Sequence, residues 1–175
     1  MKPWHELLIE AKQVGTIFHY TKLKTAIPIL SSGNLKSSQE SGVVNKSVDS
    51  GGKSHISFSR NIGTTGDIIR DFGTVRMSFD GNKISNKYKI APHLDSDNYI
   101  TRDIGEMEER VMAKKLDIDK YCTRIDILND ALFDYGLAME LAEIWRKKKY
   151  KFKINIVSKF TNAKLQDKFI QNTFS

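Results

Sequence analysis

The chain has 175 residues, of which 39% are hydrophobic and 28% are charged, and its formal net charge is +7. This length is typical of one domain that buries about two-thirds of its unfolded surface, so we expect residues 1–175 to form a single domain. The single cysteine, Cys122, excludes an internal disulfide, and the four histidines lack the spacing of a zinc site. The N-terminus lacks the apolar core of a signal peptide, and no run approaches the roughly 20 apolar residues of a membrane span. We therefore expect a cytoplasmic protein without a membrane partner.

The first third of the chain alternates between predicted helices and a strand. Trp4–Val14 has the apolar spacing of a helix, and the β-branched and aromatic residues of Thr16–Tyr20 predict a strand. Leu23–Leu30 again has helical spacing, with Thr21 placed to cap it and Ser31-Ser32-Gly33 placed to end it. Because Pro28 lies inside this segment, we expect a short or kinked helix. Leu35–Ser54 is rich in Ser, Gly, Lys and Asn and is predicted to be a long loop.

The remainder of the chain is predicted to supply most of the strands and the strongest helix. The strands are expected at His55–Arg60, Thr74–Phe79, Arg110–Met112, Cys122–Ile127 and Phe152–Val157, and the helix at Ala131–Arg146. Strands and helices are interspersed, without the regular alternation of a parallel β-α-β fold. We therefore predict a single-domain α+β fold around a strongly bent, mostly antiparallel sheet with flanking helices.

Much of the positive charge lies in one segment, Arg146–Lys153, which reads Arg-Lys-Lys-Lys-Tyr-Lys-Phe-Lys. One interpretation is a helix C-terminus whose cations offset the helix dipole, followed by a solvated edge strand. The other is a binding patch for an acidic partner such as nucleic acid, nucleotide phosphates or an acidic protein face. The sequence alone leaves both open.

Three short segments carry candidate chemistry. In the first, Phe18-His19-Tyr20-Thr21, the side chains of His19 and Tyr20 are expected on opposite faces of a strand. In the second, Ile56–Arg60, Ser57 and Ser59 share a strand face, and two hydroxyls on an inner face need hydrogen-bond partners. Arg60 follows, and its planar donor fork suits a diphosphate.

The third segment is a cluster of carboxylates, Glu106-Met107-Glu108-Glu109, at the start of a predicted strand. Three neighbouring carboxylates repel one another, which raises at least one pKa if the site is enclosed. The alternative interpretation is a solvated acidic first turn of a helix.

In this order, the three segments resemble the ADP-ribosyltransferase superfamily. The resemblance spans Thr16 to about Met112 and implies NAD as co-substrate. It implies that His19, with Tyr20 and Thr21, grips the nucleotide, and that the strand of Ser57, Ser59 and Arg60 supports the NAD pocket. The first strand carries His where the arginine-type toxins have Arg, and Phe58 stands in the middle of the Ser-x-Ser pattern.

The same resemblance assigns roles to the glutamates. Glu106-Met107-Glu108 matches the family's Glu-x-Glu spacing, so Glu108 is expected to stabilise the cation that forms as nicotinamide leaves, and Glu106 to assist the acceptor. A shift of register would place Glu109 in the catalytic position instead. We therefore expect a mono-ADP-ribosyltransferase acting on a protein or nucleic acid, of the kind found among bacterial toxins or phage effectors.

Two alternatives stay open. One is a non-catalytic basic protein on the same fold that blocks a protein or nucleic-acid surface. The other is 2′-phosphate transfer from RNA, since the opening segment also looks like the tRNA 2′-phosphotransferases; those enzymes have no catalytic glutamate, whereas this chain has three. The sequence indicates neither the acceptor nor the oligomeric state.

Overall fold

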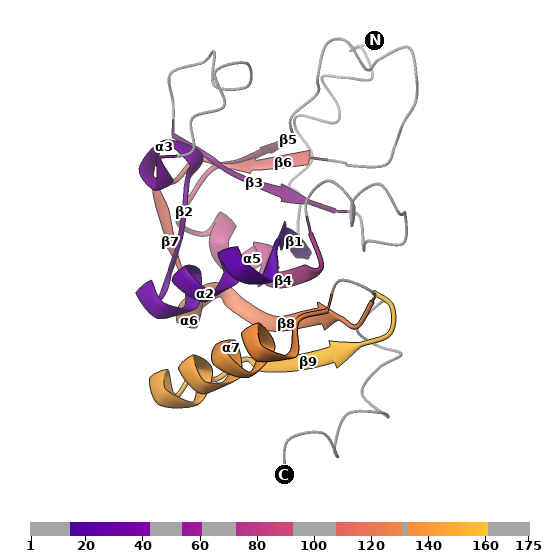
Figure 1. The fold of residues 1–175 in the computed structure, drawn as a ribbon. Helices are drawn as coiled ribbons and strands as arrows, with labels where there is room; N and C mark the ends of the chain where they lie inside the picture. The colour runs from indigo at the N-terminus through magenta and orange to yellow at the C-terminus, as the bar shows by residue number, and fades with distance from the viewer. Residues whose placement is uncertain (1–14, 43–53, 61–72, 93–107, 131–132, 161–175) are drawn as a thin grey trace, which may run out of the picture.

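Strands from both halves of the chain pair into one seven-stranded sheet in the order β5-β6-β3-β1-β4-β8-β9 (Figure 1). The computed structural model describes residues 15–42, 54–60, 73–92, 108–130 and 133–160. The strands of this sheet are β1 (Thr16–Thr21), β3 (Ile56–Ser59), β4 (Val75–Asp80), β5 (Ile90–Pro92), β6 (Glu108–Val111), β8 (Cys122–Leu128) and β9 (Lys153–Val157). All neighbours are antiparallel except β8 and β9, which are parallel. The predicted mostly antiparallel α+β architecture is confirmed.

The helices are α2 (Leu23–Ser32), α3 (Ser38–Ser41), α5 (Gly81–Ser85), α6 (Ile118–Tyr121) and α7 (Tyr135–Lys148). The long helices α2 and α7 pack against each other. Helix α2 ends as predicted at Gly33, whose left-handed backbone closes the last turn on the Leu30 carbonyl. The prediction that Thr21 caps this helix is wrong, because the N-cap residue is Lys22 and no side chain caps there. The helix continues through the exposed Pro28.

The main core lies between α2, α7 and one face of the sheet. Alternate strand residues point to that face, as a period of two requires, and they meet the apolar stripes of the two helices. The core includes Ile17, Met77, Phe79 and Ile125 from the sheet, Leu23, Ala26 and Leu30 from α2, and Ala138 and Leu141 from α7. A second, smaller cluster lies on the opposite face and contains Tyr20, Leu128, Val157 and Phe160.

The predicted strands are confirmed to within a few residues, but two other predictions need correction. Residues 35–54 do not form one long loop, because β2 (Asn34–Lys36) and α3 lie at its start; residues 43–53 are outside the described part. Strand β2 pairs with β7 (Lys115–Asp117) in a separate two-stranded sheet. Three-residue strands have too little alternation to be predicted from sequence. The strong helix begins at Tyr135, where the Asp134 carboxylate caps it, rather than at Ala131.

The predicted helix at Trp4–Val14 lies outside the described residues. No helix in the described ranges has the length and apolar character needed to cross a membrane.

Candidate functional site

Strands β1 and β3 pair at Phe18 and Ser59, and no further pair joins them among the described residues. By contrast, β1 pairs with β4 along its whole length, from Thr16 to Thr21. The sheet therefore divides at β1 and β3 into a part with β5, β6 and β3 and a part with β1, β4, β8 and β9. We call this division the fork. Figure 1 shows β3, β5 and β6 above it and β4, β8 and β9 below it.

The His19 side chain joins β1 to the backbone of β3 at the fork. Its Nδ1 atom lies 3.1 Å from the Ser57 carbonyl oxygen. Because a carbonyl only accepts, Nδ1 carries the proton, which leaves Nε2 as an acceptor in the neutral ring. Burial lowers the pKa of His19 below its usual 6.5, although the hydrogen bond to the Ser57 carbonyl opposes this shift. The ring is thus predominantly neutral at pH 7.

Glu109 lies on the same face of the sheet as His19, two strands away. Phe58 pairs with Glu109 across β3 and β6, and the Phe58 ring meets the His19 ring edge-on with 5.9 Å between centroids. Directly paired residues of antiparallel strands point to the same face. His19, Phe58 and Glu109 therefore form one row, in which two strand spacings, roughly 10 Å, separate the outer residues.

The Glu109 carboxylate is buried, with 1% of the residue exposed, and it forms an ion pair with Arg60. The Arg60 Nε atom donates to Glu109 Oε1. The other carboxylate oxygen, Oε2, is buried and has no hydrogen-bond partner among the described residues. A buried acceptor without a partner is costly, so it calls for an explanation such as a catalytic role or a bound water or ion.

The other predicted site residues are distributed around this row. Ser57 is exposed and Ser59 is buried, and both lie on the face opposite Phe58. Thr21 is buried at the end of β1. Glu108 pairs with Ser59 in the ladder, whereas Glu106 lies outside the described residues.

Tyr20 points away from His19, as the strand alternation predicted. Its ring packs edge-on against Phe160, and its register partner on β4 is Arg76. Burial raises the pKa of Tyr20 to about 12, despite the opposing effect of Arg76. The structure thus does not bring the Tyr20 side chain together with His19; only the backbone of Tyr20 adjoins the fork.

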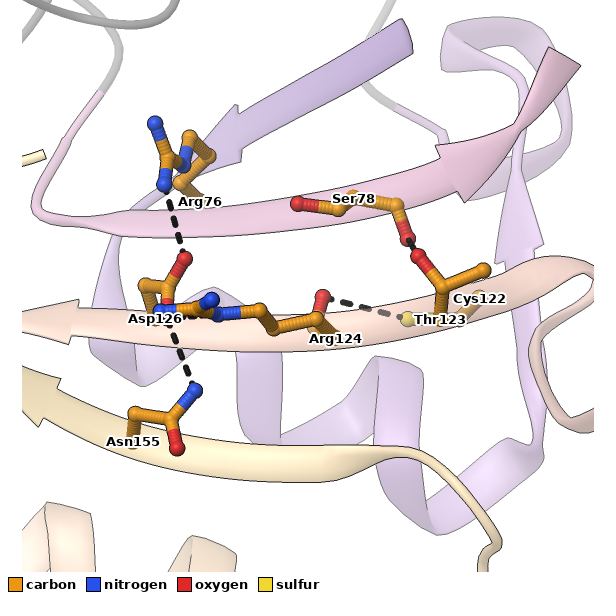
Figure 2. A network of polar contacts seen from close by, with 7 residues as sticks. All are labelled: Arg76, Ser78, Cys122, Thr123, Arg124, Asp126 and Asn155. Atoms are coloured by element: carbon orange, nitrogen blue, oxygen red, sulfur yellow. Dashed lines mark hydrogen bonds and ion pairs between the residues drawn. The ribbon is translucent and has the colours of Figure 1, made fainter. Parts of the chain in front are cut away.

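A buried polar network lies on the same face of the sheet as Tyr20, opposite His19 (Figure 2). Asp126 accepts hydrogen bonds from Arg76 Nη2 at 2.8 Å, Arg124 Nε at 2.6 Å and Asn155 Nδ2 at 2.9 Å. The Arg76 guanidinium also lies over the rings of Phe18 and Phe160, at 5.0 and 4.9 Å. The network joins β4, β8 and β9 beside β1.

No local pattern in the sequence predicts this network. Arg76 alternates with Val75 and Met77, and Asp126 alternates with Ile125 and Ile127, which is the usual pattern of a solvated strand face. The described residues contain no group of three or more His, Cys, Asp or Glu arranged to hold a metal ion.

Comparisons with known proteins support the fold. No protein-family model matches this sequence. No curated protein matches it either. Three solved structures of DarT from Thermus sp. 2.9 are similar, one with NAD+, one with carba-NAD+ and one with ADP-ribosylated single-stranded DNA. The chain has the ADP-ribosyltransferase fold.

The similarity extends over most of both proteins. The TM-score is 0.55 in each case, with 10–11% sequence identity, and the match covers 82–85% of this chain and 94–98% of the DarT chains. The ADP-ribosyltransferase fold predicted from the three sequence segments is therefore confirmed, whereas the roles of individual residues stay predictions.

Proposed function

We propose that this protein is an NAD-dependent mono-ADP-ribosyltransferase that modifies nucleic acid, with its reaction centre at the fork. The observation that carries the proposal is the row His19–Phe58–Glu109 across three neighbouring strands of an ADP-ribosyltransferase fold. The DarT structures with NAD+ and with ADP-ribosylated single-stranded DNA support NAD as co-substrate and single-stranded DNA as acceptor. The net charge of +7 suits such an acceptor.

In this proposal Glu109 stabilises the reacting sugar. The bond between the ribose C1′ and the nicotinamide nitrogen breaks, and its electrons neutralise the pyridinium. A positive charge develops on the ribose, and a carboxylate in a water-poor site stabilises it electrostatically. Glu109 is buried and its Oε2 has no partner among the described residues, and in this proposal Oε2 accepts a hydrogen bond from a ribose hydroxyl. Arg60 holds Oε1 and so fixes the orientation of the carboxylate.

His19 would bind the same sugar from the other side of the row. Its Nδ1 donates to the Ser57 carbonyl, so the ring is fixed and Nε2 accepts a hydrogen bond from a ribose hydroxyl. The acceptor nucleophile then forms a bond to C1′ and loses a proton. Glu106 and Glu108 remain candidates for receiving that proton. Thr21 and Arg60 lie on the face of the row and remain candidates for NAD contacts, whereas Tyr20, Ser57 and Ser59 point to the opposite face.

The test is transfer of label from NAD carrying a radioactive phosphate to single-stranded DNA, with RNA, duplex DNA and a protein lysate as parallel acceptors. We expect label on single-stranded DNA with the wild type and loss of at least about 100-fold in rate with Glu109→Gln, in the range for one lost electrostatic contact in a transition state. Glu108→Gln is the matched variant on the neighbouring position. Circular dichroism would establish that both variants fold.

Two outcomes would contradict the proposal. Transfer at the wild-type rate by Glu108→Gln, Glu109→Gln and the double variant would remove the glutamates from the mechanism. A folded wild-type protein that neither transfers label nor releases nicotinamide would favour the non-catalytic binding protein. The Arg60–Glu109 pair, in which only the carboxylate is fully buried, is also compatible with that alternative, because an ion pair can serve structure alone.

A further inference from the structure

We propose that the segment Arg146–Lys153, here called the basic segment, is the docking surface for the phosphate backbone of single-stranded DNA. This inference rests on the proposed function, because it assigns a place on the surface to the acceptor. It concerns residues at the end of α7 and the start of β9, which belong to neither the fork nor the buried polar network.

The basic segment accounts for nearly all of the protein's net charge. It contains six Lys and Arg residues and no Asp or Glu. The rest of the chain carries the other 22 Lys and Arg and all 21 Asp and Glu, a net charge of +1 against +7 for the whole. The excess of positive over negative charge in the chain is thus nearly equal to the charge of this one segment. Such a segment attracts polyanions at a defined place.

All six cations are exposed: Arg146, Lys147, Lys148, Lys149, Lys151 and Lys153. None of them forms an ion pair with an acidic side chain in the ranges that the structure describes. Like charges at this density repel one another, and the repulsion is unfavourable for the isolated fold. A polyanion would remove that repulsion and release its own counterions on binding.

The two ordinary explanations each cover only part of the segment. Cations in the last helical turn offset the helix dipole, which accounts for Arg146, Lys147 and Lys148. Lysine on an edge strand prevents edge-to-edge association, which accounts for Lys153 on β9. Neither explains Lys149, which adopts the left-handed backbone conformation with φ 57°, usually occupied by glycine.

The basic segment is held in place by aromatic residues within it and by Trp145, which directly precedes it. The Trp145 Nε1 atom donates to the Phe152 carbonyl at 2.7 Å, which ties the helix to the strand. The Tyr150 hydroxyl donates to the Leu30 carbonyl at 2.7 Å, and the rings of Tyr150 and Phe152 stack with 4.9 Å between centroids. A fixed backbone presents its lysines without the ordering cost of a disordered basic tail.

The experiment measures binding of a fluorescein-labelled single-stranded DNA of about 20 nucleotides by anisotropy over a range of salt concentrations. The test variant is Lys147→Gln/Lys148→Gln/Lys149→Gln. The control variant is Lys24→Gln/Lys36→Gln/Lys115→Gln, which removes three exposed lysines outside the basic segment. Both variants have the same net charge, so a difference between them reports position. Thermal unfolding establishes that both fold.

We expect the dissociation constant for DNA to rise 10- to 100-fold in the test variant at about 0.1 M salt. We also expect the slope of log K against log salt to fall by about 2, since each lost phosphate contact on a single strand contributes about 0.7. Nicotinamide release from NAD without DNA should be unchanged in the test variant. That readout separates the proposed enzymatic activity from the proposed DNA-docking surface. Lack of NAD cleavage by the wild type would contradict the activity, while the DNA-binding measurement would still test the docking surface.

Equal affinity in the test and control variants would overturn the inference, and so would a wild type that binds no DNA. Binding of the wild type to vesicles of phosphatidylserine, but not to DNA, would also overturn it in favour of an anionic membrane surface.

Discussion

Arg76 and Asp126 form a buried ion pair across strands β4 and β8, with 2.8 Å between Nη2 and Oδ2 and with at most 1% of either residue exposed. Fifty positions separate them in the chain. Because Arg76 is also the register partner of Tyr20, the pair lies directly beside the strand that carries His19. Charged side chains that bind one another therefore lie at the centre of the sheet face opposite His19.

Replacing Asp126 by Ala should destabilise the protein strongly. The change leaves the Arg76 guanidinium buried without its carboxylate and also removes the acceptor of Arg124 and Asn155. Breaking one side of a buried pair costs about 3–5 kcal/mol. Urea unfolding measures the free energy of unfolding, with Asp119→Ala as a comparison at an exposed position outside the network. A loss below about 1 kcal/mol would show that the pair contributes little to the stability of the sheet.

Replacing Gly73 by Ala should strain the end of β1. Gly73 has φ +115°, and an added Cβ would lie 2.5 Å from the Thr21 carbonyl oxygen. Gly15 is a matched control, because it has φ +116° and an added Cβ would meet no described atom within 4 Å. Both changes carry the same backbone cost, so their difference isolates the clash. We expect Gly73→Ala to lose about 1–3 kcal/mol more than Gly15→Ala in urea unfolding, and equal losses would contradict the close approach.

Ionisation of the Tyr20 phenol should lower the free energy of unfolding at alkaline pH. Burial raises its pKa from 10.0 to about 12, so the folded protein keeps the phenol neutral where the unfolded chain releases the proton. The contribution to stability is complete below pH 10 and is lost as pH rises from 10 to 12. The free energy of unfolding should therefore fall more steeply between about pH 10 and 12 in the wild type than in Tyr20→Phe. Parallel curves would refute the raised pKa.

His19 should titrate below its ordinary pKa of 6.5, because burial disfavours the charged ring. The unfolded chain then binds the proton more readily, so this contribution to stability is complete above pH 6.5 and declines as pH falls toward the lower pKa of the folded state. Proton NMR of the imidazole signals, assigned with His19→Asn, measures the midpoint directly. A midpoint at or above 6.5 would contradict the burial of the ring.

The same titration should affect the proposed reaction. Protonation removes the acceptor at Nε2 and adds a positive charge beside the ribose on which a positive charge develops. Nicotinamide release should therefore decline in acid with the midpoint measured for His19. A rate that is independent of pH across that midpoint would separate His19 from the chemistry.

Local sequence determined the elements around the fork and the family resemblance. The β-branched and aromatic run of Thr16–Tyr20 predicted β1, the apolar spacing after it predicted α2, and Gly33 marked the end of that helix. Alternation in Ile56–Ser59 predicted β3 and the opposite orientations of Phe58 and its neighbouring serines. These are properties of a few adjacent residues, whose periods of 3.6 and 2 can be read directly.

Tertiary structure alone decided which glutamate lies on the same face of the sheet as His19. Glu108 and Glu109 are adjacent in sequence, and only the pairing of Phe58 with Glu109 places Glu109 in the His19 row and beside Arg60, 49 positions away. A shift of one residue between the strands would turn every side chain to the other face. In the same way, the burial of Arg76 and Asp126 depends on the register of β4 and β8. Register between distant strands is set by the packing of the whole core, so no local pattern contains it.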